Sequence, residues 1–122
     1  MEPVEGTRAL FLAEAGQEGK IGVNESGVGV LPNILFTDQE VQYGLSVLVL
    51  LRMIPGCGET SEAVALVKGS PRAGGSHLLI GDAAGHITGL ELTPTGIGEI
   101  GPENGTIVHT TITTDAQKVG RP

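Results

Sequence analysis

The chain is poor in aromatic residues, in cysteine and in clustered positive charge. Only Phe11, Phe36 and Tyr43 are aromatic, so any core is built from Val, Ile, Leu and Ala without the large anchors that usually dominate burial. The net charge is −7 and Lys and Arg are dispersed, which argues against binding to nucleic-acid phosphates. Cys57 is the single cysteine, which excludes a disulfide within the chain.

The pattern of a signal peptide or a membrane span is also missing. The chain starts Met-Glu-Pro-Val-Glu, without a basic region followed by an apolar one. The longest apolar run, residues 45–54, is too short to cross a bilayer and contains Arg52. We therefore predict a soluble, cytoplasmic protein.

The length of 122 residues allows one domain at most. We predict a single partial domain over residues 1–122, in which residues 1–8 form a disordered lead-in and residues 113–122 a disordered tail. Twenty glycines add an entropic cost to folding. We therefore expect the chain to need a partner segment.

Residues 19–33 have the pattern of a β-hairpin. Two apolar runs with β-branched residues at every second position flank the turn Asn24-Glu25-Ser26-Gly27. Asn and Gly accept positive φ in such turns, and the Asn24 side chain is expected to close this one. Pro32 should end the second strand or lie at an edge. Before the hairpin, the short run 9–13 predicts a buried strand.

Two helices are predicted after the hairpin. The first is expected from Gly44 to Ile54, where Pro55-Gly56 ends it; Thr37 to Glu40 has the form of a capping box and is an alternative start. The second helix is expected to begin with Thr60 as N-cap and to bury a stripe of small and apolar residues, namely Ala63, Leu66 and Val67.

From Ser76 the apolar residues recur at every second position, which predicts a meander of strands. The expected strands are 76–80, 86–92, 97–100 and 106–111, separated by turns rich in Gly, Pro and Asp. A hairpin, two helices and then a run of strands indicate an α+β fold with antiparallel pairing and the helices on one face of the sheet.

Few residues are candidates for chemistry on their own pattern. Cys57 lies in a loop with no histidine nearby in sequence, so we interpret it as an incidental thiol, with a small hydrolase using Cys57 as a weaker hypothesis. His77, His86 and His109 lack the spacing of zinc motifs and are interpreted as separate strand histidines.

Three more polar residues are assigned from their local setting. Asp82 is expected to serve its turn. Glu91 is expected on a solvated strand face, with a cleft-facing role as the alternative. Asn33, after Pro32, is our candidate for a polar group that lines a substrate cleft.

Five stretches occur in the order of one known family. They are GKIGVNESGVGVLPN at residues 19–33, Leu50-Leu-Arg52, Ser61 to Leu66, GDAAGHITGLELTP at residues 81–94, and Ile107-Val-His-Thr110. Together these stretches resemble the acyl-CoA:6-aminopenicillanic acid acyltransferase (C45 peptidase) family of N-terminal-nucleophile hydrolases. The resemblance covers residues 9 to 111.

The resemblance implies a fold and a reaction. The fold would be a four-layer αββα sandwich, of which this chain supplies one helix layer and part of the sheets. The reaction would be amide cleavage or acyl transfer through a cysteinyl thioester. The family's nucleophile is a Cys freed by self-cleavage, so it is expected upstream of residue 1, in a partner segment or subunit. No cofactor is implied, and acyl-CoA and a small-molecule amide or other acyl donor are candidate substrates.

The resemblance also assigns a role to one histidine. The family's oxyanion-binding Asn stands at a strand start in a Ser/Ala-Asn-Phe setting; here that place is held by Ser76-His77-Leu78, which puts His77 in an oxyanion-type position. The family's His-Thr-Asn-His is His109-Thr-Thr-Ile112 here. These departures leave two hypotheses: a fragment or subunit of an acyltransferase or amidohydrolase, or a degenerate, non-catalytic binding or structural module of the same fold.

Overall fold

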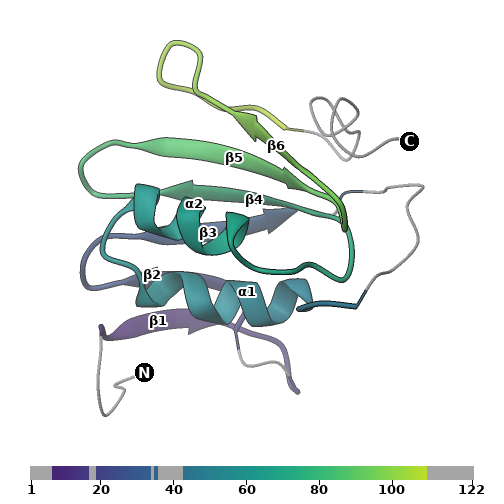
Figure 1. Cartoon of the computed structure of the whole chain (residues 1–122). Coiled ribbons are helices and arrows are strands. Elements are labelled where there is room, and N and C mark those ends of the chain that lie inside the picture. The colour runs from purple at the N-terminus through teal and green to yellow at the C-terminus, as the bar shows by residue number, and fades with distance from the viewer. Residues whose placement is uncertain (1–6, 17–18, 34, 36–42, 110–122) are drawn as a thin grey trace.

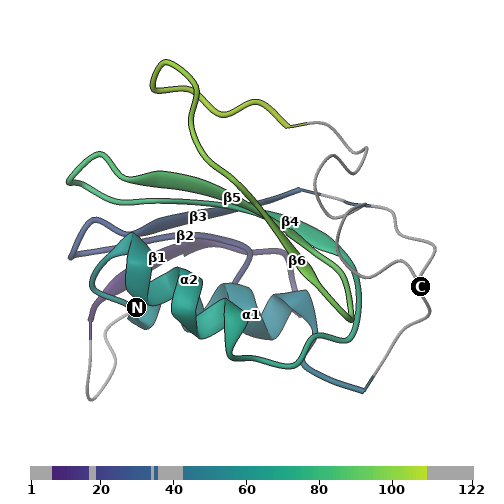
Figure 2. The same ribbon diagram turned by 45° about the horizontal axis from the view of Figure 1, so that its top comes forward.

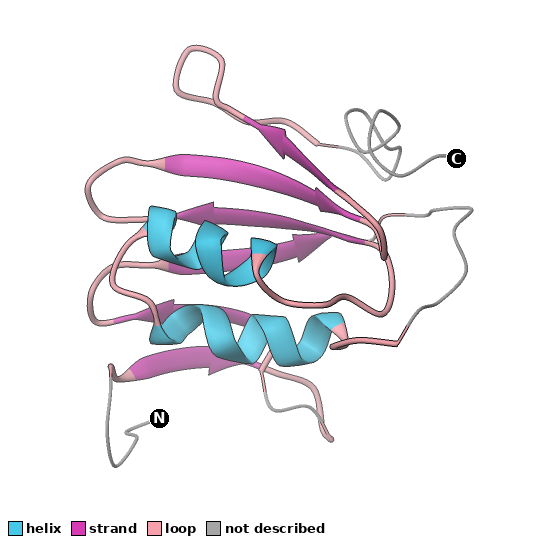
Figure 3. Ribbon diagram, in the orientation of Figure 1, coloured by secondary structure: helices cyan, strands magenta, loops and turns pink. Residues whose placement is uncertain are grey.

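The chain folds into one antiparallel sheet with two helices packed on one of its faces (Figures 1 and 3). The computed structural model describes residues 7–16, 19–33, 35 and 43–109. The six strands lie in sequence order, β1-β2-β3-β4-β5-β6, and every neighbouring pair is antiparallel. The elements are β1 Ala9–Leu12, β2 Ile21–Asn24, β3 Gly29–Asn33, α1 Val47–Met53, the 3-10 turn η1 Ile54–Gly56, α2 Thr60–Lys68, β4 Ser76–Gly81, β5 Ile87–Leu92 and β6 Ile97–Ile100.

This arrangement confirms the predicted α+β class. One helix layer lies on one sheet, and the chain that follows β6 runs over the opposite face (Figure 2). Neither helix of the described chain has the length and apolar character needed to span a bilayer.

The core lies between the helices and the sheet. Leu78 and Ile80 of β4 and Leu90 and Leu92 of β5 point toward the helices, because alternate residues of a strand face opposite sides of a sheet. The other residues of this core come from the hairpin and the two helices, including Val28, Val30, Leu50, Leu51, Ile54, Cys57, Ala63 and Val67.

Asn24 closes the hairpin turn as predicted and also ties the hairpin to the helix layer. Its Oδ1 accepts the Val28 N–H at 2.9 Å, and Gly27 takes a φ of +88° in the turn. Its Nδ2 donates to the carbonyls of Pro55 at 2.9 Å and Cys57 at 2.7 Å. One buried amide therefore satisfies groups from the turn, from η1 and from the loop that follows it.

Asp82 serves its turn as predicted and has a second role that the sequence did not suggest. Its Oδ1 accepts the N–H groups of Ala84 and His86, whereas Oδ2 accepts the Thr60 N–H at 3.0 Å. Glu59 rather than Thr60 is the N-cap of α2 and makes no side-chain cap bond. The hydrogen bond from Thr60 is the main cause that holds the pKa of Asp82 well below its usual range.

Several local expectations differ from the structure. Strand β1 is an edge strand whose Leu10 and Leu12 are 72% and 66% exposed, so the prediction of a buried strand is wrong. Helix α1 begins at Val47 rather than Gly44, because Leu45 pairs with Arg72 in an isolated parallel bridge. Pro32, in contrast, agrees with its expected edge position: it is the next-to-last residue of β3 and lies beyond the pairing of that strand with β2.

Of the last predicted strand, 106–111, the structure describes residues 106–109, and these do not form a strand. Glu103 pairs with Thr106 in an isolated bridge, and residues 107–109 continue without regular structure. Residues 1–6 of the predicted lead-in at 1–8, the capping box at 37–40 and the tail at 113–122 lie outside the described residues.

Replacing Asn24 by Ala tests the link between the hairpin and the helices. We expect Asn24→Ala to lower the free energy of unfolding by about 3 kcal/mol, because buried groups at the turn and after η1 lose their partner. The measurement is urea unfolding followed by circular dichroism. Ser26→Ala, in the exposed part of the same turn, should change it by less than about 0.5 kcal/mol. Equal effects of the two variants would contradict this account.

Candidate functional site

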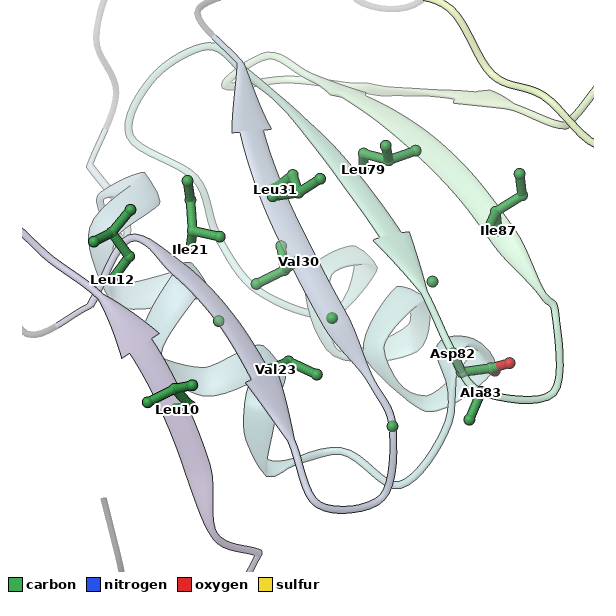
Figure 4. Close-up of a pocket in the computed structure, with 14 residues that line it drawn as sticks. Leu10, Leu12, Ile21, Val23, Val30, Leu31, Leu79, Asp82, Ala83 and Ile87 are labelled. Atoms are coloured by element: carbon green, nitrogen blue, oxygen red, sulfur yellow. The ribbon is translucent and has the colours of Figure 1, made fainter.

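The face of the sheet turned away from the helices carries an apolar groove (Figure 4). The groove has a volume of about 560 Å³. Val23 and Leu31 in the groove are each nearly half exposed, and Leu10 and Leu12 are more so. Side chains from five strands line the groove, among them Leu10, Leu12, Ile21, Val23, Leu31, Leu79 and Ile87. Large apolar surface of this kind is uncommon on a free-standing domain and usually marks a contact surface.

A row of polar side chains crosses the same face at its other end. The strand register places Asn33 of β3 opposite His77 of β4, and His77 opposite Glu91 of β5. Directly opposite residues of antiparallel strands lie on the same face with their Cβ atoms close together. Three polar side chains from neighbouring strands therefore form one line on the sheet.

His109 covers this row from the segment that follows β6. Its ring stacks on the His77 ring, with centroids 3.7 Å apart and planes within 5°. Its Nε2 lies 2.7 Å from Oε1 of Glu91. The side chains of His109 and Glu91 are 3% and 0% exposed. A carboxylate is stable at such depth only when it is paired or hydrogen-bonded, and the His109 imidazole supplies that partner.

His77 lies deep in this cluster and is held uncharged. Its residue is 1% exposed, and neither of its ring nitrogens has a hydrogen-bond partner among the described residues. Burial, and to a lesser extent the nearby His109, lower the pKa of His77 to about 4, against an opposing effect of Glu91. At neutral pH the ring therefore offers one N–H donor and one acceptor nitrogen.

Gly89 of β5 makes room for the His77 ring. A Cβ at position 89 would lie 2.8 Å from Nε2 of His77 and 3.5 Å from Ile100. Contacts below 3.0 Å force a neighbour to move, and the packed His77 ring cannot swing away freely because His109 is stacked on it. A side chain at position 89 is therefore incompatible with the observed cluster.

A second cavity opens beside the polar row. It has a volume of about 480 Å³. Asn33, His77 and His109 contribute its polar groups, and the remaining lining residues are Leu31, Pro32, Leu79, Ile107 and Val108. Leu31 and Leu79 also line the apolar groove, so groove and cavity are neighbours on the sheet face. The described lining contains no thiol, hydroxyl or amine side chain.

The structure brings some of the predicted residues together and separates others. His77 and Asn33 line one cavity, although their predicted catalytic roles stay predictions. The expectation that Glu91 lies on a solvated face is wrong, because this residue is 0% exposed. The histidines are not all separate: His77 and His109 stack, whereas His86 is exposed beside Asp82. Within the described chain no three His, Cys, Asp or Glu residues are arranged to hold a metal ion.

Cys57 lies on the other side of the sheet from this cavity. It is part of the core between sheet and helices and is 4% exposed. Burial, with a smaller contribution from Glu62, raises the pKa of its thiol. Because the thiolate is the reactive form, this setting disfavours Cys57 as a nucleophile.

Sequence reasoning missed the parts that His109 and Gly89 play. His109 contacts Glu91, which lies 18 residues earlier in the chain. No local sequence pattern encodes a contact over this separation. Glycine at position 89, in a strand of otherwise larger residues, was an available signal, since glycine inside a strand often marks a close approach.

Substitution of Gly89 tests whether the cluster is as tightly packed as the structure shows. We expect Gly89→Ala to lower the free energy of unfolding by about 1–3 kcal/mol through overpacking and to reduce the upfield ring-current shift of the stacked His77 protons in NMR spectra. Gly101→Ala, where a Cβ would meet nothing within 4 Å, is the matched control and should leave both quantities unchanged. An unaltered His77 spectrum in Gly89→Ala would contradict the packing.

Comparison with known proteins agrees with the resemblance seen in the sequence. Among solved structures, the chain is similar to a penicillin V acylase from Agrobacterium tumefaciens, with a TM-score of 0.55 and 22% sequence identity. That match covers 68% of this chain and 29% of the acylase chain, so this chain spans less than a third of the acylase. Among curated proteins nothing matches. A model of the family described as acyl-coenzyme A:6-aminopenicillanic acid acyl-transferase matches residues 8–115. The chain therefore belongs to the acyl-coenzyme A:6-aminopenicillanic acid acyltransferase family.

Proposed function

We propose that this chain is a fragment or subunit of an acyltransferase or amidohydrolase of the N-terminal-nucleophile, C45 peptidase type. It would cleave an amide bond or transfer its acyl group through a cysteinyl thioester, with the nucleophile supplied from outside the chain. The observation that carries the proposal is the cavity that Asn33 shares with the buried His77, whose ring nitrogens have no hydrogen-bond partner among the described residues. Its place on an apolar sheet face supports the need for a partner segment.

The described residues around the cavity support an external nucleophile. The described lining residues bring hydrogen-bonding groups but no attacking group, and Cys57 is buried on the opposite side of the sheet. A cysteine at the start of a partner segment would meet this need, because its own terminal amine can serve as the base for its thiol.

His77 and Asn33 would act on the acyl carbonyl. Attack by a thiolate places negative charge on the carbonyl oxygen, and fixed hydrogen-bond donors that face this oxygen stabilise the transition state. The uncharged His77 ring carries one N–H group that can donate. The Asn33 amide, opposite it on β3, is the second candidate donor.

The partner segment would cover the apolar groove. Leu10, Leu12, Val23 and Leu31 expose apolar surface on this face, and a second sheet packed there would bury it and complete a four-layer sandwich. The match to less than a third of the acylase chain supports a larger assembly. Cytoplasmic location stays a prediction from the sequence.

The experiment uses the protein together with any in-frame segment that precedes it in the source gene. Penicillin V and an acyl-CoA with 6-aminopenicillanic acid are the probes, and mass spectrometry detects an acyl group on the nucleophile. We expect His77→Ala to lower kcat by about 10²–10³-fold, the effect of losing one oxyanion donor. His77→Asn, which restores the family's amide, should retain more activity than His77→Ala.

Two controls define the outcomes of this test. His86→Gln changes an exposed histidine outside the cavity and should leave kcat unchanged. Cys57→Ser should also leave activity intact. Loss of all activity in Cys57→Ser, or full activity in His77→Ala, would contradict the proposal.

A non-catalytic module of the same fold is the second candidate. His77 in place of the family's Asn, and Thr111-Ile112 in place of the second half of His-Thr-Asn-His, favour it. Such a module would bind an amide in the cavity without turning it over. Binding of penicillin V that is weakened by His77→Ala, with no acyl-enzyme under any condition, would support this candidate over the enzyme.

A further inference from the structure

We propose that Glu91 and His109 are positioning residues, which fix the orientation of the His77 ring at the edge of the cavity. The meaning of this role in catalysis rests on the proposed function. The orientation and the protonation of the His77 ring can be measured without any reaction.

Glu91 determines how His109 is held. The 2.7 Å contact joins Oε1 of Glu91 to Nε2 of His109, a hydrogen-bond distance with one proton between the two atoms. Both side chains are almost completely buried, and a hydrogen bond to a buried charged group is among the stronger ones in proteins. The pair therefore sets the position of the His109 ring.

His109 in turn fixes the plane of His77. The two rings are stacked within 5° of parallel, while the Nε2 edge of His77 lies over the bare backbone of Gly89. The ring is thus limited by an imidazole on its face and by β5 at its edge. Leu79 and Asn33 flank the cavity side, where a ligand would meet the ring.

Burial, His109 and Glu91 together determine the charge of His77. The titratable groups that face it are His109 from the segment after β6 and Glu91 from β5; β3 contributes the uncharged Asn33, and β6 places Gly98 opposite Glu91. Burial and His109 lower the pKa of His77, and Glu91 raises it by less. Because the pKa is depressed to about 4, the neutral ring persists through the whole range above that pH.

An uncharged ring suits the site better than a cation. A permanent positive charge at His77 would repel an ammonium group of a partner's terminal amine, whereas a neutral N–H still stabilises developing negative charge on oxygen. Neutral imidazoles with depressed pKa values are known to serve as such electrophilic donors. Burial and the neighbouring His109 favour the neutral ring and Glu91 opposes it, so the part of Glu91 is to hold the His109 ring in place.

The test is an NMR titration of the full 122-residue chain labelled with ¹⁵N-histidine, between about pH 3.5 and 8.5, which brackets the ordinary and the depressed pKa. The resonances are assigned with His77→Asn, His86→Gln and His109→Phe. We expect His77 to titrate near pH 4 and His109 to carry a proton on Nε2. Titration of His77 near 6.5, the ordinary value, would overturn the proposal.

Two variants separate positioning from a purely structural role. His109→Phe keeps an aromatic ring on His77 but removes the neighbouring imidazole, whose effect lowers the pKa of His77, so the pKa of His77 should rise. Glu91→Gln, whose amide both donates and accepts, should allow His109 to carry its proton on either nitrogen. A structural role alone would lower stability and leave the His77 pKa in the folded protein unchanged, which would overturn the proposal.

None of these readouts depends on turnover. A protein that shows the expected His77 and His109 states but no acyl transfer would support the positioning role and count against the proposed function. Acyl transfer with an ordinary His77 pKa would do the reverse.

Discussion

The alternation of side chains along β4 and β5 is the constraint on which the rest of the structure depends. Leu78, Ile80, Leu90 and Leu92 enter the core beneath the helices. The residues that alternate with them face the opposite side of the sheet, where His77 of β4 lies opposite Glu91 of β5. A shift of one residue in this register would exchange the two sets and place an ionisable pair in the apolar core. Core and candidate site are therefore fixed by one pairing.

The polar cluster of His77, Glu91 and His109 lowers the stability of the fold. His77 and His109 hold three buried ring nitrogens without a hydrogen-bond partner among the described residues, and each such group costs about 1–3 kcal/mol. An apolar pair in the same place would pack without this cost. Buried polar groups kept at such expense are expected where they serve a ligand or a reaction, which agrees with their position beside the cavity.

Sequence reasoning recovered the parts of the fold that depend on neighbouring residues. The hairpin turn at Asn24, both helices and the strand faces of β5 follow from local spacing and turn chemistry. It failed where the structure depends on contacts between residues that are far apart in the sequence. Leu10 is exposed in an apolar groove whose lining comes from five different strands, and the N–H of Thr60 at the start of α2 is bound by Asp82, 22 residues away.

The candidate site shows the same division. The family motif pointed to His77, and the position after Pro32 pointed to Asn33, so two members of the cavity were named from the sequence. Glu91 was assigned to solvent, because a lone acidic residue in a strand usually faces water. Only the fold brings His109 over the sheet to pair with it, and stacking between residues 77 and 109 has no local signal.

The central claim is that the cavity beside His77 is where the acyl group reacts, on a sheet face that a partner segment covers. Its most direct test is a crystal structure of this chain together with that segment, with the carboxylate product of amide cleavage bound. The account predicts a product oxygen within hydrogen-bond distance of a His77 ring nitrogen, and the groove at Leu10 and Leu31 buried under the partner segment. A product bound elsewhere, or side chains of the covering segment filling the cavity beside His77, would contradict it.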